Sequence, residues 1–310
     1  MLTTAANIKL LEVGLRKVFD EAEVEQNRKS IIPMLFDVIP SEKAWEEFYT
    51  VSALGDLQPW QGKLDYGNMY PGYWTRLEPG EFSLAVQIER KFIKDNQYPV
   101  MNNIPRSLAI AKARTREKQA VKVLAYAFST AFPFARNEEG VAMCSNSHTT
   151  KVPGVSTSTG LDNLGTSAIN KTALQTARIA YRKLKTSIGE MQDEIADTVI
   201  CGTSLRPAVE EAIGESGMAK SDKDPDSLNL VNTEYGKWKI IEIPRLDDYD
   251  TNNWFICNGR RLKDSLKWVN RDQDSGMLPI DDTLGPRYFA YDRYGFAWLD
   301  WRAIYGNQVS

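Results

Sequence analysis

Apolar residues recur at helical spacing in the first part of the chain. Between residues 6 and 29, Ile8, Leu11, Leu15 and Phe19 stand among charged residues. This spacing predicts one or two amphipathic helices. After two prolines, Ser41 is a suitable N-cap for a short helix that we expect over residues 41–48.

The pattern changes completely over residues 55–80, where glycine and proline recur every few positions. Turn formers at this density exclude a helix. The aromatic residues of this segment, which have little local core to enter, are Trp60, Tyr66, Tyr70, Tyr73 and Trp74. The next segment, residues 82–93, alternates apolar and polar residues in its first half, which is typical of a strand. We expect the two segments to form a long two-stranded excursion, which needs a surface to lie on because an isolated hairpin is only marginally stable.

A long helix is predicted next, over residues 104–132. It begins with Asn103 as N-cap and Pro105 in the first turn, and no glycine or proline follows before Phe132. At ~1.5 Å per residue the helix would be roughly 40 Å long. Beyond its first turns the helix carries the cations Lys112, Arg114, Arg116, Lys118 and Lys122. A solvated helix face is favoured for them over a dedicated nucleic-acid site.

The second half of the chain contains short elements of both kinds. In chain order we expect a loop over 132–165, a helix within 166–188, a strand over 198–201, a helix over 205–213, an exposed loop over 215–229, strands over 238–243, 253–257 and 262–269, and strand structure from Arg287 to Tyr305. Because no regular alternation of strand and helix appears, the pattern predicts an α+β fold without βαβ units.

Composition narrows the function classes. The 310 residues carry a net charge of −3, so the whole molecule is not an electrostatic surface for nucleic acid. No apolar run is long enough to span a bilayer, and the N-terminus does not resemble a signal peptide. Cys144, Cys201 and Cys257 form no metal or redox motif, so we expect buried thiols in a reducing cytoplasm.

Candidate chemistry is sparse. The single histidine, His148, lies in a polar loop and is expected to be exposed. With one histidine in the chain, metal sites that need several histidines are excluded. The acidic run over 247–250 has no calcium-loop spacing and is expected to be a surface turn. Phosphate-binding and dinucleotide motifs are absent. We therefore expect no catalytic, metal or cofactor site, although enzymes whose residue pairs meet only in space stay open.

The order of these parts resembles the major capsid protein of tailed phages, the Hong Kong 97-type fold. Four segments are more closely similar to the Mu-like major head subunit family: "LEVGLRKVFDEA" near the N-terminus, "VQIERKFIKDNQ" after the aromatic region, and further along "TVICGTSLRPAVEEAI" and "WKIIEIPRLDDYDTNNWFICN". The resemblance covers nearly the whole chain and rests on the order and spacing of the parts.

The resemblance implies a domain organisation. It makes residues 1–54 an N-terminal arm and lead-in, 55–98 the extended loop, 99–164 with 286–310 the peripheral domain with a spine helix over 104–132, and 165–285 the axial domain. The five aromatic residues of the extended loop would contact a neighbouring subunit, and the stretch "RYFAYDRYGFAWLDWRAIY" would be a strand packed beneath the spine helix. The cations of the spine helix are candidates to face the genome.

The implied function is that of a structural major capsid protein, with no catalysis and no cofactor. It would assemble as hexamers and pentamers into an icosahedral shell, in the host cytoplasm and without a membrane. A separate scaffolding protein, a portal, possible decoration proteins and non-specific contact with double-stranded DNA are the implied partners. Lys63 lies in the loop region where some family members form a crosslink, but a solvated side chain is favoured. The alternative is an α+β enzyme or nucleic-acid-binding protein of unknown substrate.

Overall fold

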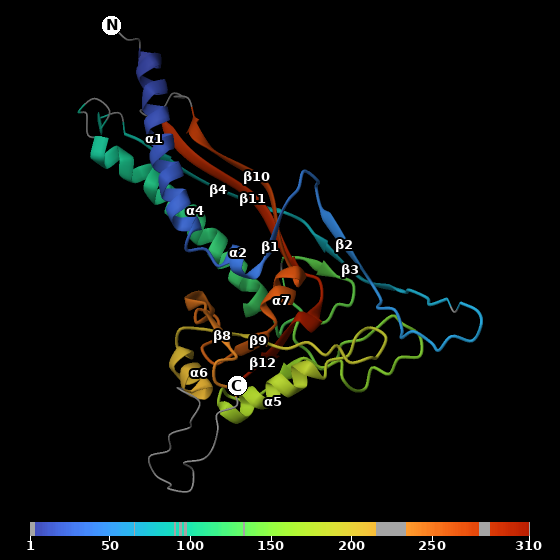
Figure 1. Ribbon diagram of the computed structural model, residues 1–310. Helices are drawn as coiled ribbons and strands as arrows, with labels where there is room; N and C mark the ends of the chain where they lie inside the picture. Colours follow the sequence, from blue (N-terminus) through green and yellow to red (C-terminus); the bar gives the residue numbers. More distant parts are fainter. Residues whose placement is uncertain are drawn as a thin grey trace, which may run out of the picture.

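The computed structural model describes residues 4–64, 66–89, 91, 92, 95, 98–132, 134–214, 234–278 and 286–309. Within these residues the chain forms a four-stranded, a five-stranded and a three-stranded sheet. Two long helices run beside the first sheet, the second sheet lies near the C-terminus, and the third sheet projects to one side (Figure 1). The α+β fold expected from the sequence is confirmed.

The four-stranded sheet and the long helices form one layered unit. Its elements are α1 (Thr4–Asn27), α2 (Ile32–Leu35), β1 (Asp37–Pro40), β4 (Gly80–Gln87), α4 (Tyr98–Ala125), β10 (Leu266–Leu278) and β11 (Arg287–Trp298). The strand order is β1-β10-β11-β4, with β11 antiparallel to both neighbours. Helices α1 and α4 lie against the face of β11 that carries Tyr288, whose ring is 5.9 Å from that of Phe19. Burial of these side chains holds the two helices on the sheet.

The five-stranded sheet has the order β6-β12-β9-β7-β8. Its elements and neighbours are β6 (Leu164–Gly165), α5 (Lys171–Arg182), β7 (Thr198–Cys201), α6 (Arg206–Ile213), β8 (Lys239–Glu242), η2 (Pro244–Leu246), β9 (Trp254–Cys257), α7 (Gly259–Ser265), η3 (Trp301–Ala303) and β12 (Ile304–Asn307). Every residue of β7 and β9 is buried, which explains why these strands have little polar alternation. Phe128, just beyond α4, stacks on Phe255 of β9 at 5.4 Å, so this sheet shares a core with the long helix.

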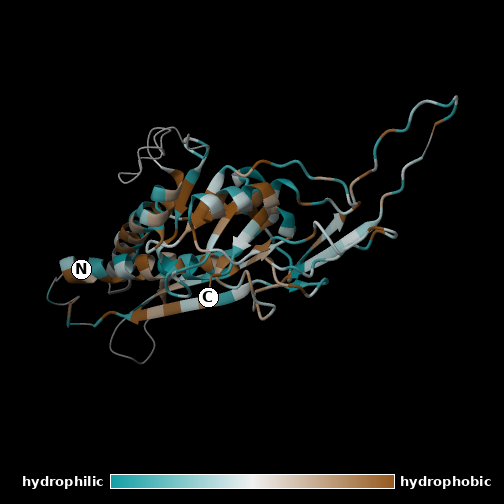
Figure 2. Cartoon of the chain, turned by 90° about the horizontal axis from the view of Figure 1, so that it is seen from below, coloured by the Kyte–Doolittle hydropathy of each residue, from teal (hydrophilic) through white to brown (hydrophobic). Residues whose placement is uncertain are grey.

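The three-stranded sheet carries a projecting hairpin. It consists of β2 (Glu46–Val51), β3 (Pro71–Leu77) and the two-residue β5 (Arg136–Asn137), in the order β2-β3-β5. We call residues 46–77 the extended hairpin and residues 52–70, which join its strands, the tip. Figure 2 shows the tip standing well away from the rest of the chain.

The strand partners of the extended hairpin differ from the prediction. We expected residues 82–93 to pair with the aromatic segment, but β4 ends at Gln87 and pairs with β11, from Arg287↔Gln87 to Tyr294↔Gly80. The partner of β3 is instead β2. The predicted helix over 41–48 is wrong: residues 41–45 form no helix, and residues 46–48 belong to β2. The two aromatic residues and two β-branched residues that end β2 favour a strand.

Other boundaries also move. The long helix is confirmed but begins at Tyr98 and ends at Ala125, with Pro105 inside it. Residues 262–265, the first half of the strand expected over 262–269, belong instead to α7, because the Asn258 side chain accepts from the N–H groups of Arg260 and Arg261 and caps a helix there. The expected strand over 287–305 is interrupted by η3, so β12 joins the other sheet.

One expectation about connectivity is wrong. Strands β7 and β8 are parallel neighbours with α6 between them in the chain, which makes a βαβ unit. The predicted strands over 198–201 and 253–257 and the helix over 205–213 are confirmed. In the described residues, no helix has the length and apolar content needed to cross a membrane.

Candidate assembly surface

The root of the extended hairpin is fixed to the body of the subunit. Strand β3 pairs with β5 through Thr75↔Asn137 and Arg76↔Arg136. The Tyr73 hydroxyl lies 2.6 Å from Thr149 Oγ1, and the Trp74 N–H donates to Glu138 Oε2 at 3.1 Å. These contacts fix the orientation of the base of the hairpin relative to the rest of the subunit.

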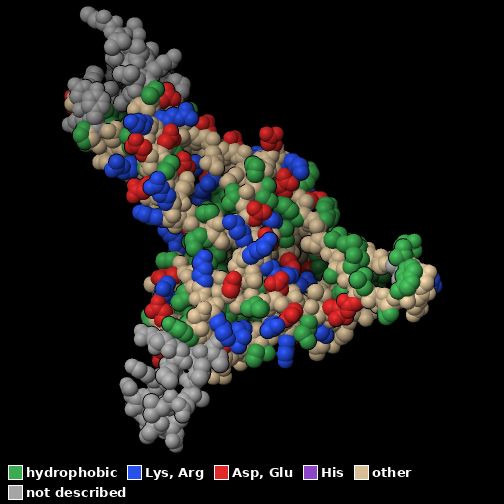
Figure 3. Space-filling view, in the orientation of Figure 1, with side chains coloured by type: hydrophobic (Ala, Val, Ile, Leu, Met, Phe, Trp, Pro, Cys, Tyr) green, Lys and Arg blue, Asp and Glu red, His purple; other side chains and the backbone are tan. Residues whose placement is uncertain are grey.

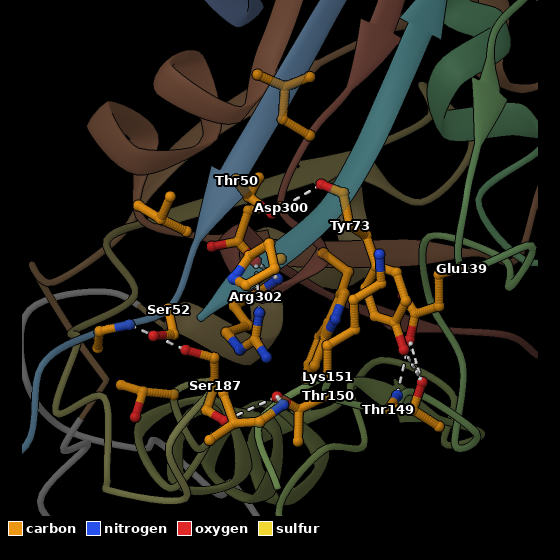
Figure 4. A pocket seen from close by; sticks show the side chains of 18 of the residues that line it. Thr50, Ser52, Tyr73, Glu139, Thr149, Thr150, Lys151, Ser187, Asp300 and Arg302 are labelled. Atoms are coloured by element: carbon orange, nitrogen blue, oxygen red, sulfur yellow. Dashed lines mark hydrogen bonds and ion pairs between the residues drawn. The ribbon is translucent and has the colours of Figure 1, made fainter. Parts of the chain in front are cut away.

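A polar pocket of 290 Å³ lies beneath this root (Figure 4). Its walls come from the hairpin, from the loop around Thr149 and from η3, where Arg302 pairs with Asp300 at 3.2 Å. Across it, the N–H of Ala53 donates to Ser187 Oγ at 3.1 Å. The tip therefore leaves the body over a polar, hollow base rather than over an apolar core.

The tip exposes large apolar side chains. Leu57 is 99 % exposed, Tyr66 89 % and Trp60 71 %. The other large apolar side chains exposed along the hairpin are Tyr49, Val51, Leu54, Leu64 and Met69. Contiguous apolar surface of this kind on a projection marks a contact surface, because leaving it in water costs free energy that a partner can recover.

The structure divides the five predicted contact aromatics into two groups. Trp60 and Tyr66 are exposed on the tip, whereas Tyr70, the last residue of the tip, and Tyr73 and Trp74 of β3 are half-buried. Tyr73 contacts its own subunit, with the Lys151 ammonium 5.0 Å from its ring centre. Contact of these five residues with a neighbour stays a prediction, and the geometry favours Trp60 and Tyr66.

Sequence reasoning missed the aliphatic residues of the tip. Leu54, Leu57, Leu64 and Met69 are all more than half exposed. The available signal was their occurrence in a segment too rich in glycine and proline to bury them. Only the aromatic residues of that segment were singled out from the sequence.

A second apolar surface runs along the β4 edge of the four-stranded sheet, where β4 meets α4. Strand β4 is an edge strand, so its outer backbone groups have no strand partner among the described residues. Between β4 and α4 lies a groove, which we call the β4–α4 groove. It has two adjoining hollows of 390 Å³ and 530 Å³ that share Leu84 and Leu108. Leu84 and Val100 are 52 % and 44 % exposed, so both an open edge and apolar side chains are available to a partner.

The cations of α4 do not form one solvated face. Lys112 pairs with Glu23 of α1 at 2.6 Å, and its side chain is 8 % exposed. Arg116 donates to both carboxylate oxygens of Asp292 at 2.6 Å and 2.9 Å. For these two residues the expected solvated face is wrong, because they join α4 to α1 and to β11.

The remaining cations are freer. Arg114 and Lys118 are exposed and Lys122 is half-buried. On the visible face, basic side chains along the flank formed by α1 and α4 are interspersed with acidic ones (Figure 3). This surface can offer a weak and diffuse attraction to an anion, but no concentrated positive patch.

The described residues offer little chemistry. They contain no cluster of histidine, cysteine and acidic side chains able to hold a metal ion. The three thiols are buried and unpaired as expected, and burial raises the pKa of Cys201 to about 11. Burial raises the pKa of Cys144 and Cys257 still further, so none of the three is a reactive thiolate near neutral pH.

His148 is not the exposed loop residue that we expected. It is 1 % exposed, and its ring stacks on Trp301 with 4.1 Å between ring centres. Its position was unpredictable from the local sequence because Trp301 lies far away in the chain.

Comparisons with solved structures identify the fold. The procapsid of bacteriophage JBD30 matches with a TM-score of 0.52 and 14% identity over 99% of this chain and 76% of that one. The cyanophage Pam1 capsid matches with 0.53 and 12%, over 89% and 90%. A virus-like particle from Pyrococcus furiosus matches with 0.53 and 10%, over 96% and 99%. At these identities the likeness shows the shared fold.

Family comparisons add the function. The model for the phage capsid protein family matches residues 75–307, which is well over half of the chain. The model for the Mu-like prophage major head subunit gpT matches residues 8–137. No curated protein sequence matches significantly. The chain therefore belongs to the phage capsid protein family, as a structural major head subunit with the Hong Kong 97-type fold that builds the icosahedral capsid of the virion.

Proposed function

We propose that subunits join in the shell by laying the tip of one copy on the β4–α4 groove of the next. The observation that carries this proposal is the exposed apolar tip, with Leu57, Trp60 and Tyr66 all more than 70 % exposed. The groove offers apolar side chains and, among the residues that the structure describes, a strand edge without a strand partner, along which an extended segment can lie.

The arrangement is heterologous, because two different surfaces of the same chain meet. Contacts of this type close into rings when the rotation between copies permits. We propose that the rings are hexamers and pentamers. Within them, the four-stranded sheet with α1 and α4 forms the peripheral domain, and the five-stranded sheet forms the axial domain near the ring centre.

The partners beyond the shell are proposals that rest on the family. A separate scaffolding protein, a portal and decoration proteins would act with the subunit during assembly in the host cytoplasm. Double-stranded DNA would contact the inner surface without sequence preference, through the exposed cations of α4.

Trp60→Ala tests the role of the tip. Because Trp60 is 71 % exposed, its loss is expected to change the free energy of unfolding of the unassembled subunit by no more than ~0.5 kcal/mol. Loss of an aromatic interface anchor typically costs about 2 kcal/mol or more per contact, so shells should be fewer or less stable. The measurements are a thermal melt of the unassembled subunit and sedimentation with electron microscopy of shells.

Lys63→Ala is the matched control on the same tip. Lys63 is exposed and polar, so its removal should leave both subunit stability and shell formation close to wild type. Normal shells from Trp60→Ala would overturn the proposed role of the tip. A large fall in subunit stability would show instead that Trp60 is internal.

A further inference from the structure

His148, the only histidine of the chain, lies between two hydrogen-bond acceptors. Its Nδ1 atom is 3.2 Å from Glu139 Oε2, and its Nε2 atom is 3.3 Å from the Met143 carbonyl oxygen. A neutral imidazole has only one N–H, so with a carboxylate at Glu139 one ring nitrogen would turn a lone pair toward an acceptor. The pair is satisfied when a proton lies between Nδ1 and Oε2 while Nε2–H donates to Met143.

The imidazole is closely packed. The side chain of His148 is fully buried and that of Glu139 is 3 % exposed. The Trp301 ring lies parallel to the imidazole within 5°. A buried polar group without a partner is costly, so we expect a change in protonation to move a side chain.

The same carboxylate holds the root of the extended hairpin. Glu139 Oε1 accepts from the Thr149 N–H at 2.7 Å, and Thr149 Oγ1 lies 2.6 Å from the Tyr73 hydroxyl of β3. A continuous path of hydrogen bonds therefore runs from His148 through Glu139 and Thr149 to the hairpin. Figure 4 shows the hairpin end of this path, with Glu139, Thr149 and Tyr73 beside the pocket.

Other charged groups around the ring are paired among themselves. On the Trp301 side, the Arg302 guanidinium lies 4.4 Å from the centre of the indole and pairs with Asp300. On the hairpin side, Lys151 pairs with Glu138 at 2.6 Å. Of Glu138, Glu139, Lys151, Asp300 and Arg302, only Glu139 has a charged group in direct contact with the imidazole.

We propose that His148 is a proton-dependent latch that fixes the direction of the extended hairpin. With the proton in place, Glu139 is held between His148 and Thr149, and Thr149 holds Tyr73. When the proton leaves, the lone pair of Nδ1 faces the carboxylate. The ring or Glu139 then turns, and the bond between Thr149 and Tyr73 loosens. The hairpin is freer to change its angle at higher pH than at lower pH.

The latch can be measured in the unassembled full-length subunit. Because the chain has one histidine, labelling with ¹⁵N-histidine gives the signals of a single ring, and its protonation can be followed across pH. Hydrogen exchange, corrected for the intrinsic effect of pH, reports the opening of β3. Protection of β3 amides is expected to fall about five- to tenfold as the ring loses its proton, which corresponds to the loss of one hydrogen bond.

Tyr73→Phe is the decisive variant, because it removes the hydroxyl and keeps the ring. His148 should titrate as in wild type, while the protection of β3 should lose its dependence on that titration. Glu139→Gln should displace the ring titration and reduce protection at low pH.

Three outcomes would overturn the latch. They are a β3 protection that does not change as the ring titrates, a change that persists in Tyr73→Phe, and a ring that is already neutral at the low end of the pH range. The consequence for shells rests on the proposed docking of the tip. The measurements need no shell, so failure of the latch and failure of the docking proposal are distinguishable.

Discussion

At the scale of single residues, the fold depends on close approaches that only glycine permits. Gly295 of β11 lies beneath Leu77, a fully buried residue at the end of β3. A methyl group on Gly295 would clash with Leu77 Cδ2 and would lie 3.2 Å from the Pro79 backbone. This contact seats the root of the extended hairpin against the four-stranded sheet.

Gly295→Ala is therefore expected to be destabilising. Overpacking of a buried contact typically costs 1–3 kcal/mol, so we expect a fall of about 2 kcal/mol in the free energy of unfolding, measured by urea denaturation. Gly80→Ala, also at the join of hairpin and sheet, is the control. A methyl group there would meet the Phe82 ring at 3.5 Å, an ordinary contact, and equal losses in the two variants would contradict the argument.

At the scale of elements, the sequence predicted those helices and strands whose formation depends on neighbouring residues in the chain. The apolar runs of β7 and β9 and the proline-started, glycine-ended α6 were predictable from a few residues each. The pairing of β4 was not, because strands β2 and β4 are each compatible with β3, and the choice depends on β11, some 200 residues further on. His148 was misplaced for the same reason, since Trp301 buries it. At the candidate site, the sequence predicted an exposed aromatic segment but could not separate its root from its tip.

Ion pairs between elements hold the long helix α4 in position. They cannot be predicted from the hydrophobic pattern, because their partners lie far apart in the sequence. Arg116 joins α4 to β11 through Asp292, which is 3 % exposed, and also donates to Asn270 of β10 at 3.1 Å. Removing one partner of a buried pair leaves the other charge uncompensated. Asp292→Asn should therefore lower the free energy of unfolding by roughly 3 kcal/mol, measured by urea denaturation.

The surface pair between Lys17 and Glu21 provides the control for this measurement. Both side chains are more than 60 % exposed, so Glu21→Gln should change stability by less than ~0.5 kcal/mol. A loss for Asp292→Asn no larger than that of Glu21→Gln would show that the pair does not hold α4 on the sheet.

At the scale of the whole molecule, the charge of the subunit limits how strongly it could bind DNA. The net charge is −3, and Lys112 and Arg116 of α4 are paired with Glu23 and Asp292. With so little free positive charge, the proposed contact of the subunit with DNA would be weak. The contact would be multiplied over many copies in the shell while each stays weak.

In the proposed contact with DNA, Arg114, Lys118 and Lys122 would meet the phosphates, and the salt dependence of binding can be calculated. Three phosphate contacts give a slope of about −2.7 in log affinity against log salt, or roughly a 40-fold loss between 50 and 200 mM. Arg114→Gln with Lys118→Gln should reduce the slope by about 1.8 in a gel-shift titration of the subunit. Neither residue is buried, so stability should stay near wild type. Lys237→Gln, a cation outside α4, is the control and should leave the slope unchanged. The charge distribution predicts a weak and diffuse contact. Binding that does not weaken with salt, or that prefers one DNA sequence, would contradict this prediction.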